Sequence, residues 1–447
     1  MRQLLYNAVI INDGERFNGY VIIDGEKIAT VGKGEPSEEV LSSVDCKEDI
    51  NGFYLIPGVI DDQVHFRDPG LTHKADIATE SAAAIAGGVT SFMDMPNTMP
   101  QTITLEALEA KHQRAQEVSL ANYSFFIGAT NDNIDELLKC DYSLIPGVKL
   151  FLGASTGNML VDNDTALQRI FSEIPTLIAI HSEDEDIIRQ NKEKAQAQWG
   201  DDVPVEQHPA IRSTEACYES TKRAVELAKK YNSRLHILHI STEAELEFLT
   251  TEPIEQKRVT AEVCAHHLWW SDEDYARLGT RIKWNPAIKT AQDRKALQQA
   301  LADGRIDIVA TDHAPHLLSE KEGGALKAAS GGPLVQFSLP LMLELARNGI
   351  FSVEWVVDRM CHAPARLYAI DKRGYIKEGY YADLAIINPN AEYTVTDNDV
   401  ISRCAWTPLA GETLHNKVTG TYVNGKKVFN NGTIDYTVKG KALKYNH

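Results

Sequence analysis

Short apolar runs alternate with longer amphipathic stretches along the chain, from about residue 55 to residue 315. Eight of these runs are nearly continuous in apolar residues, which is typical of strands buried on both faces of a parallel sheet. They read LIPGVIDDQVH, TSFMDMP, NYSFFIGA, GVKLFL, LIAIHSE, RLHILHIS, VTAEVCAHH and IDIVATDHAP. The stretches between them include KADIATESAAAIAGG, TEACYESTKRAVELAKKYN and TAQDRKALQQALADG, and the last ends on a glycine typical of a helix C-cap. Repeated strand-then-helix units predict an α/β fold, a (β/α)8 TIM-type barrel over residues 55–379.

Both ends of the chain have a different pattern, in which short apolar segments are separated by turn residues. LLYNAVI and YVIIDGEKIATVG lie near the start, with a hairpin turn at Asp24-Gly25. ADLAIINP and KVTGTYVNGKKVF lie near the end, with Asn-Gly turns at 424–425 and 431–432. We therefore expect residues 1–54 and 380–447 to form one small, discontinuous β-sandwich domain beside the barrel.

Composition limits the kinds of partner. The 447 residues are 43% hydrophobic, which allows one large core and a smaller one. Lysine and arginine number 45 and aspartate and glutamate 63, so the formal net charge is −18. This charge opposes non-specific binding to nucleic acid or to anionic membranes. An anionic small-molecule substrate stays compatible with it, because local cations or a metal ion can invert the field inside a cleft.

The cysteines and the first segment bear on the cellular compartment. The six cysteines are scattered and form no CxxC pair, so neither a disulfide framework nor a thiolate zinc site is predicted. The segment MRQLLYNAVIINDGERFNGY has no sustained apolar core, and no run approaches the roughly 18 apolar residues of a membrane span. We expect a soluble, cytoplasmic protein.

Polar and ionisable residues stand at the ends of the predicted strands. They are His65, Asn97, Lys149, His181, His239 and Asp312. In a (β/α)8 barrel the carboxyl ends of the strands meet at one face, which is the active-site face. A single histidine is more often structural, but several imidazoles and a carboxylate on one face predict a site for zinc or a similar metal ion. Lys149 is unusual there, because a buried ammonium is costly unless it is paired or neutral.

Seven motifs resemble, in content and order, those of the dihydroorotases of the amidohydrolase superfamily, over essentially the whole chain. They are HFRDPG at 65–70, MPNT at 95–98, KLFLGASTGN at 149–158, HSED at 181–184, HILHIS at 236–241, TDHAPH at 311–316 and GYYADLAII at 379–387. The resemblance implies a homodimer and one or two bound Zn²⁺ ions. The implied metal ligands are His65, Lys149, His181, His239 and Asp312, with Lys149 N-carboxylated so that its carbamate can bridge two ions.

The resemblance also implies a reaction, the reversible hydrolysis of (S)-dihydroorotate to N-carbamoyl-L-aspartate. Ring closure, the reverse direction, is a step of de novo pyrimidine biosynthesis. Asp312 would serve as general base and then as general acid. The implied substrate contacts are Arg67, Asn97, Asn285, His316 and, unless it is a packed structural histidine, His267, with Ser155 and Thr156 donating hydrogen bonds from a loop. Arg67 suits a substrate carboxylate, because a guanidinium offers planar, forked donors.

One position departs from the family pattern, because the usual His-x-His reads Gln63-Val64-His65 here. An amide oxygen is a weaker zinc ligand than an imidazole. Three outcomes stay open. Gln63 substitutes as a ligand and two metals persist, or the more buried site empties and a single metal remains on Lys149, His181 and His239, or catalysis is lost. Of the two carboxylates before it, Asp61 shares the strand face of Gln63 and Asp62 points away.

Two alternative functions follow. Loss of catalysis would leave a non-catalytic, dihydroorotase-like subunit that supports a partner such as aspartate transcarbamoylase. Against it, the other site residues are all present. The second alternative is a hydantoinase-like hydrolase of another cyclic amide. Arg67 argues against this one, because such substrates carry no carboxylate that needs an arginine.

Overall fold

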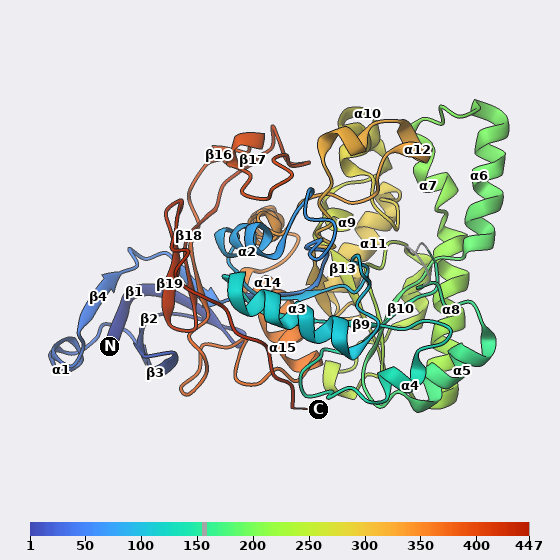
Figure 1. The fold of residues 1–447 in the computed structure, drawn as a ribbon. Coiled ribbons are helices and arrows are strands. Elements are labelled where there is room, and N and C mark those ends of the chain that lie inside the picture. The colour runs from blue at the N-terminus through green and yellow to red at the C-terminus, as the bar shows by residue number, and fades with distance from the viewer. Residues whose placement is uncertain (154–158, 447) are drawn as a thin grey trace.

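The computed structural model describes residues 1–153 and 159–446. The larger part of the molecule is built on parallel strands surrounded by helices (Figure 1). The strands are β6 (Val59–Val64), β7 (Val89–Asp94), β8 (Asn122–Phe125), β9 (Ile127–Gly128), β10 (Val148–Phe151), β11 (Ile178–His181), β12 (Leu235–Ile237), β13 (Val259–Cys264) and β14 (Ile308–Ala310). Each apolar run of the sequence contributes a strand to this set, and NYSFFIGA contributes two, which confirms the predicted strands except for the first run, described below.

These strands pair in chain order. β6, β7 and β8 form one parallel sheet, and β9 to β14 form a second. Only Phe126 separates β8 from β9. The first and last strands also meet, because Val64 forms a parallel bridge with His313 and the His65 amide donates to the His313 carbonyl at 2.7 Å. Since all the pairings are parallel, the carboxyl ends of the strands lie at the same edge.

Helices connect the strands and cover their outer side (Figure 1). They are α2 (Ile77–Ala86), α3 (Leu105–Val118), α4 (Ile134–Leu137), α5 (Asp164–Glu173), α6 (Glu185–Trp199), α7 (His208–Ile211), α8 (Thr214–Tyr231), α9 (Ala265–Trp269), α10 (Tyr275–Leu278), α11 (Ala291–Ala302), α12 (Gly324–Lys327), α13 (Ser338–Arg347), α14 (Val353–Val357) and α15 (Ala363–Leu367). α2, α8 and α11 are the three helices predicted from the sequence. Gly304 follows α11 with φ of 83°, a left-handed conformation that glycine adopts without strain.

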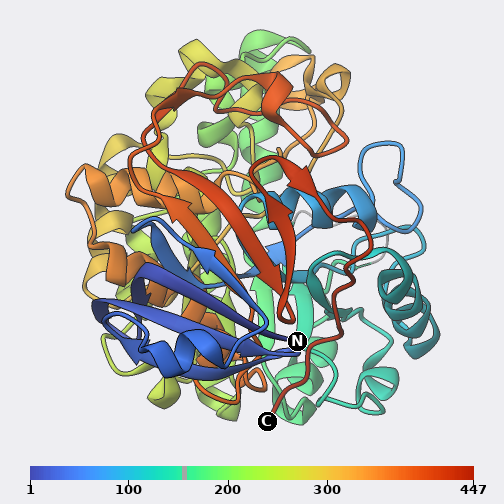
Figure 2. The same cartoon turned by 90° about the vertical axis from the view of Figure 1, so that its left-hand side faces the viewer.

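Strands from both ends of the chain form one nine-stranded sheet beside the parallel strands (Figure 2). They are β1 (Arg2–Asn12), β2 (Glu15–Asp24), β3 (Lys27–Lys33), β4 (Cys46–Asp49), β5 (Tyr54–Pro57), β15 (Leu384–Asn388), β18 (Lys417–Val423), β19 (Lys426–Asn430) and β20 (Thr433–Ile434), and the short helix α1 (Glu38–Ser42) precedes β4. Two further strands, β16 (Tyr393–Thr394) and β17 (Thr413–Leu414), pair with each other in a separate two-stranded sheet. The predicted turns are present: Asn424 and Gly425 both have positive φ, as do Asn431 and Gly432.

The run LIPGVIDDQVH does not form the single strand that the sequence predicts. Its first part, β5, pairs with β1 and β15 in the terminal sheet, and only β6 pairs with the parallel strands. Gly58 stands at the crossing, where an added Cβ would lie 2.0 Å from Thr90 Oγ1. The run is apolar throughout because both of its halves are buried, so hydrophobicity alone does not reveal the boundary.

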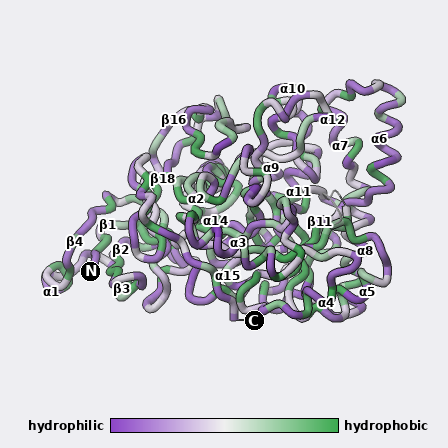
Figure 3. The backbone as a smooth tube through the Cα atoms, viewed as in Figure 1, coloured by the Kyte–Doolittle hydropathy of each residue, from purple (hydrophilic) through white to green (hydrophobic). Residues whose placement is uncertain are grey.

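The interior of the parallel strands is filled by apolar side chains, and the tube in Figure 3 is hydrophobic along many of these strands. One cluster includes Ile60, Met93, Phe126, Ala179, Leu238 and Ile308. A separate cluster, which includes Leu5, Ile10, Val21, Leu384 and Tyr422, joins the two chain ends in the terminal sheet. Among the described helices, none is long and apolar enough to cross a bilayer.

A buried ion pair between β7 and α3 offers a test of the fold's stability. The Lys111 ammonium contacts the Asp94 carboxylate and donates to the Met95 carbonyl at 3.0 Å, with both side chains at most 1% exposed. We expect Lys111→Met to lower the free energy of unfolding by about 3–5 kcal/mol, because it leaves an uncompensated buried charge. Urea unfolding measures this loss. The double variant with Asp94→Asn should lose less than the sum of the single variants, whereas an additive loss would contradict the pairing.

Candidate active site

The predicted site residues converge on one cavity of about 270 Å³ at the carboxyl ends of the parallel strands. Its lining includes every described candidate except His267: Gln63, His65, Arg67, Asn97, Lys149, His181, His239, Asn285, Asp312 and His316. Ser155 and Thr156 lie outside the described residues. The cavity also contacts Phe151, Ala314, Ala329 and Ser330, which the sequence did not single out.

His65, Asn97 and Asp312 form one corner of the cavity. The Nδ1 atom of His65 lies 2.7 Å from Asn97 Oδ1. Because that oxygen only accepts, Nδ1 carries the proton and Nε2 keeps a lone pair. Nε2 in turn lies 3.1 Å from Asp312 Oδ1. Two electron-pair donors therefore face each other, and this geometry favours a cation between them. Asn97, expected to hold substrate, here orients His65.

His181 and His239 form the opposite corner, where His181 Nδ1 lies 3.0 Å from His239 Nε2 and both side chains are buried. His181 Nε2 lies 3.0 Å from Glu183 Oε2, and Glu262 Oε1 accepts from the His239 amide at 3.0 Å. Despite burial, the Arg212 guanidinium and His181 hold the pKa of Glu183 at about 2. An ionised Glu183 that accepts Nε2–H leaves His181 Nδ1 as a ligand atom. Sequence reasoning missed both carboxylates: Glu183 lies inside the HSED motif beside His181, and Glu262 comes from another strand, β13.

Lys149 lies on β10 with its side chain 1% exposed. Its Nζ has no hydrogen-bond partner among the described residues, and it lies 4.5 Å from the centre of the Phe151 ring. Burial lowers the pKa of Lys149 to about 7, with Glu262 and Asp312 opposing the shift. An unpaired ammonium in this position is costly, so a neutral amine or a modified lysine fits the site better than a cation.

The backbone is strained at three site residues. The backbone φ angles of Arg67, His239 and Asp312 are 64°, 40° and 45°. These values lie in the left-handed region, which residues other than glycine rarely adopt. Each residue follows the end of a parallel strand. Strained conformations of this kind cluster where side-chain placement matters for function. Here they bring each of the three side chains to the cavity.

Gln63 lines the cavity, but its two amide atoms point to different neighbours. Nε2 donates to Asp312 Oδ1 at 3.4 Å, and Oε1 lies 4.0 Å from Cys264 Sγ. The Asp61 carboxylate accepts hydrogen bonds from the backbone N–H of Gln63 and from the Thr311 hydroxyl. Burial raises the pKa of Asp61 to about 8. In this arrangement Gln63 positions the Asp312 carboxylate.

A second cluster of buried ionisable side chains, Asp62, Glu262 and His236, lies beneath the cavity. Asp62 and Glu262 both approach His236 Nε2, at 3.5 and 3.4 Å, and Tyr368 donates to Asp62 at 2.9 Å. His236 Nδ1 lies 2.8 Å from Thr260 Oγ1. Although burial opposes it, contact with the two carboxylates raises the pKa of His236 to about 9. The imidazole of this group is partnered at both nitrogens, whereas Asp62 Oδ1 has no hydrogen-bond partner among the described residues.

Cations stand on one side of the cavity. Arg67 is 8% exposed, and it donates through Nε to the Pro315 carbonyl at 3.2 Å. Its Nη2 lies 3.1 Å from His316 Nε2, and Lys74 Nζ lies 3.1 Å from His316 Nδ1. Burial, followed by the charges of Arg67 and Lys74, lowers the pKa of His316 far below its usual range. Lys74 is paired with Glu320 at 2.8 Å and does not line the cavity, so Arg67, beside a neutral imidazole, is the cation suited to a substrate carboxylate.

The remaining candidates differ in their surroundings. Asn285 lines the cavity and its Oδ1 has no hydrogen-bond partner among the described residues. His267 does not line the cavity, and its Nε2 lies 3.2 Å from the Pro286 carbonyl.

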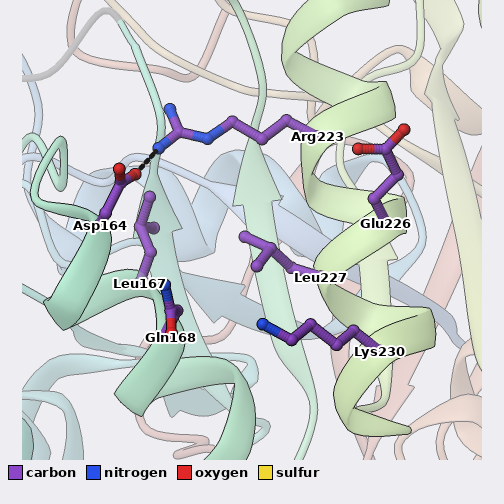
Figure 4. Close-up of a pocket in the computed structure, with 7 residues that line it drawn as sticks. All are labelled: Asp164, Leu167, Gln168, Arg223, Glu226, Leu227 and Lys230. Carbon is purple, nitrogen blue, oxygen red and sulfur yellow. Dashed lines mark hydrogen bonds and ion pairs between the residues drawn. The ribbon is translucent and has the colours of Figure 1, made fainter.

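A groove between α5 and α8 provides a contrast to the cavity (Figure 4). There Arg223 is already paired with Asp164 at 2.5 Å, and no imidazole lines the groove.

Comparison with known proteins agrees with this geometry. Residues 54–428 match the model of the amidohydrolase family. The chain therefore belongs to the amidohydrolase family, whose members are metal-dependent hydrolases. Among solved structures, an L-hydantoinase (dihydropyrimidinase) from Arthrobacter aurescens is 26% identical, with a TM-score of 0.91 over 97% of each chain.

Several dihydroorotases are among the curated relatives of this chain. One from Halobacterium salinarum is 36% identical over 395 residues, covering 87% of this chain and 88% of that protein. One from Methanosarcina acetivorans is 33% identical, covering 88% and 84%. One from Lactobacillus johnsonii is 30% identical, covering 97% of this chain and 100% of that protein. Within the amidohydrolase family, the sequence is thus similar to dihydroorotases over nearly its whole length.

Proposed function

We propose that this protein is a dihydroorotase, which hydrolyses (S)-dihydroorotate to N-carbamoyl-L-aspartate and, in the reverse direction, closes the ring for pyrimidine biosynthesis. The proposal is carried by one observation, the cavity, which brings together Lys149, Arg67 and two corners. The corners are the His65–Asp312 pair and the His181–His239 pair. The similarity to curated dihydroorotases supports the substrate. The alternative of a non-catalytic subunit lacks support, because no apolar residue stands at any position in the cavity where a donor side chain is expected.

The metal ligands in this proposal are His65, Lys149, His181, His239 and Asp312. The donor set fits the group, because each corner pairs two facing electron-pair donors and the buried Lys149 Nζ is unpartnered among the described residues. Imidazoles and carboxylates in this mixture suit zinc, in one or two ions. We propose that Lys149 is N-carboxylated, so that a carbamate bridges the corners in place of an unpaired amine. The bound metal would supply Lewis acidity and lower the pKa of its water.

Asp312 performs the proton transfers. It lies beside His65 with one oxygen held by the Gln63 amide, and it faces the cavity. In ring opening it takes a proton from the attacking water and delivers it to the ring nitrogen as the carbon–nitrogen bond breaks. In ring closure it removes the proton from the attacking nitrogen. His65 is kept in one tautomer by Asn97 throughout.

Arg67 and His316 hold the substrate carboxylate, and Asn285 donates to the ring. The homodimer stays a prediction from the resemblance.

For the architecture, we propose that the eight strand units close into a (β/α)8 barrel and that the chain ends form a small β-sandwich domain. The bridge between Val64 and His313 supports the barrel, and the hydrophobic core shared by the two chain ends supports the β-sandwich domain.

A hydantoinase-like hydrolase is the second candidate, favoured by the close similarity in fold to the L-hydantoinase. Arg67 separates the two. We expect Arg67→Gln to lower kcat/KM for dihydroorotate by about 10²-fold, because losing a charged hydrogen-bond donor costs about 1.5–3 kcal/mol. Turnover of 5,6-dihydrouracil, which lacks the carboxylate, should hardly change. The measurement is steady-state kinetics on both substrates.

Arg169→Gln provides the matched control for this test. Arg169 lies on the surface of α5, where it pairs with Glu173 and Asp135 away from the cavity. This variant should retain the kinetics of the wild type. Equal losses with both substrates in Arg67→Gln would point to a structural role for Arg67 and would remove the argument for a carboxylate clamp.

A further inference from the structure

A second group of metal-ligating side chains lies where β13 runs directly into α9 (Figure 1). One ligand atom from each of Cys264, His266 and His267 lies within 4.8 Å of the others. The residues are 0%, 0% and 2% exposed. None of them lines the central cavity or belongs to the ligand set proposed for the hydrolase reaction. The cysteine spacing predicted no thiolate site, because two of the three side chains are histidines.

The imidazoles of this group have unused nitrogens. Both ring nitrogens of His266 and Nδ1 of His267 lack a hydrogen bond of good geometry among the described residues, although the Thr311 backbone interacts with the His266 ring. The His266 ring is stacked on Trp284, with centroids 4.4 Å apart and planes at 20°, so it is not free to turn elsewhere. Buried polar atoms without partners are rare, because their desolvation is not compensated. The Asp62–His236–Glu262 group differs here, since its imidazole is partnered at both nitrogens.

The tautomer of His267 is set by its neighbour. Nε2 lies 3.2 Å from the Pro286 carbonyl oxygen, which can only accept. Nε2 therefore carries the proton, and Nδ1 keeps its lone pair toward the group. An imidazole whose far nitrogen donates to a backbone carbonyl is the usual arrangement of a metal-binding histidine.

The kind of ligand follows from the donor atoms. A thiol with two imidazoles suits zinc and similar borderline cations, and it does not suit Mg²⁺ or Ca²⁺, which prefer oxygen. A fourth donor is present, because Gln63 Oε1 lies 4.0 Å from Cys264 Sγ. The Gln63 amide nitrogen faces Asp312 instead.

We propose that Cys264, His266 and His267 bind a Zn²⁺ ion, with Gln63 as the fourth ligand, at a site separate from the ions of the central cavity. The thiol releases its proton to solvent as the zinc–sulfur bond forms. Gln63 then joins the two sites, with its oxygen on this ion and its amide on Asp312. The site does not depend on dihydroorotate being the substrate.

X-ray absorption at the zinc edge tests the proposal on the wild-type protein as purified. We expect a sulfur scatterer at about 2.3 Å from zinc, which the ligands of the central cavity cannot supply. A fully zinc-loaded protein whose spectrum contains only nitrogen and oxygen scatterers would overturn the proposal. This result needs no variant.

Cobalt substitution assigns the sulfur. Wild-type protein reloaded with Co²⁺ should have a thiolate-to-cobalt charge-transfer band in the near ultraviolet, and Cys264→Ala should lose it entirely. Cys361→Ala is the control, since Cys361 is buried in the hydrophobic core and its thiol donates to the Pro57 carbonyl at 3.3 Å. Circular dichroism checks that both variants fold. A band that survives in Cys264→Ala, or is lost equally in Cys361→Ala, would contradict the assignment.

Discussion

Replacing Lys149 with alanine is expected to lower the rate of dihydroorotate hydrolysis by about 10³-fold or more and to remove metal from the protein. The physical reason is that Lys149 lines the cavity together with both donor corners, and the proposed carbamate would supply oxygens that hold the ions there. Loss of Lewis acidity costs several kcal/mol of transition-state stabilisation, and about 4 kcal/mol corresponds to 10³-fold. Metal content and turnover are measured on the same samples.

Lys230→Ala is the control for this variant, because Lys230 lines the outer groove between α5 and α8. It should retain both activity and metal. The carbamate has a test of its own. Chelated wild-type protein reloaded with Zn²⁺ should regain more activity in the presence of bicarbonate than in buffer freed of carbon dioxide. A Lys149→Ala protein that retains rate and metal would refute the bridging role.

Replacing Asp312 with asparagine is expected to lower kcat by about 10²–10⁴-fold, the usual contribution of a positioned general base. Asparagine has nearly the same shape, but it cannot take the proton from water or return it to the ring nitrogen. His181, His239 and Lys149 remain, so the protein should keep bound metal. The measurement is kcat in both directions, together with metal content.

Asp164→Asn serves as the control, since Asp164 forms a surface ion pair with Arg223. Its kinetics should match those of the wild type. An Asp312→Asn protein with kcat within a few-fold of the wild type would show that another group carries the proton. A variant that loses its metal together with its activity would instead assign Asp312 to metal binding.

The sequence predicted most of the cavity because most candidates lie on a strand or shortly after its end, with Asn285 as the exception. His181 ends β11, Lys149 lies on β10, and Asp312 comes two residues after β14. In parallel strands such positions share an edge, so local pattern is enough to bring them together. The strands themselves were predicted because they are continuous in apolar residues.

Other features depend on contacts that local pattern does not encode. β5 joins the terminal sheet because β1 and β15 flank it, and neither neighbour can be read from the run itself. Glu262 reaches His239 from a different strand, and Asn97 orients His65 in addition to lining the cavity. The orientation of Gln63 toward Asp312 and Cys264 likewise depends on segments some 200 residues or more away in the chain.

The most direct measurement compares kcat/KM of the purified wild-type protein, with its metal content known, for dihydroorotate and for 5,6-dihydrouracil. A dihydroorotase with an arginine clamp should prefer dihydroorotate by about 10²-fold or more. Equal turnover of both substrates, or a preference for dihydrouracil, would favour the hydantoinase-like alternative. Metal-loaded protein that turns over neither substrate would contradict catalysis and leave the non-catalytic subunit.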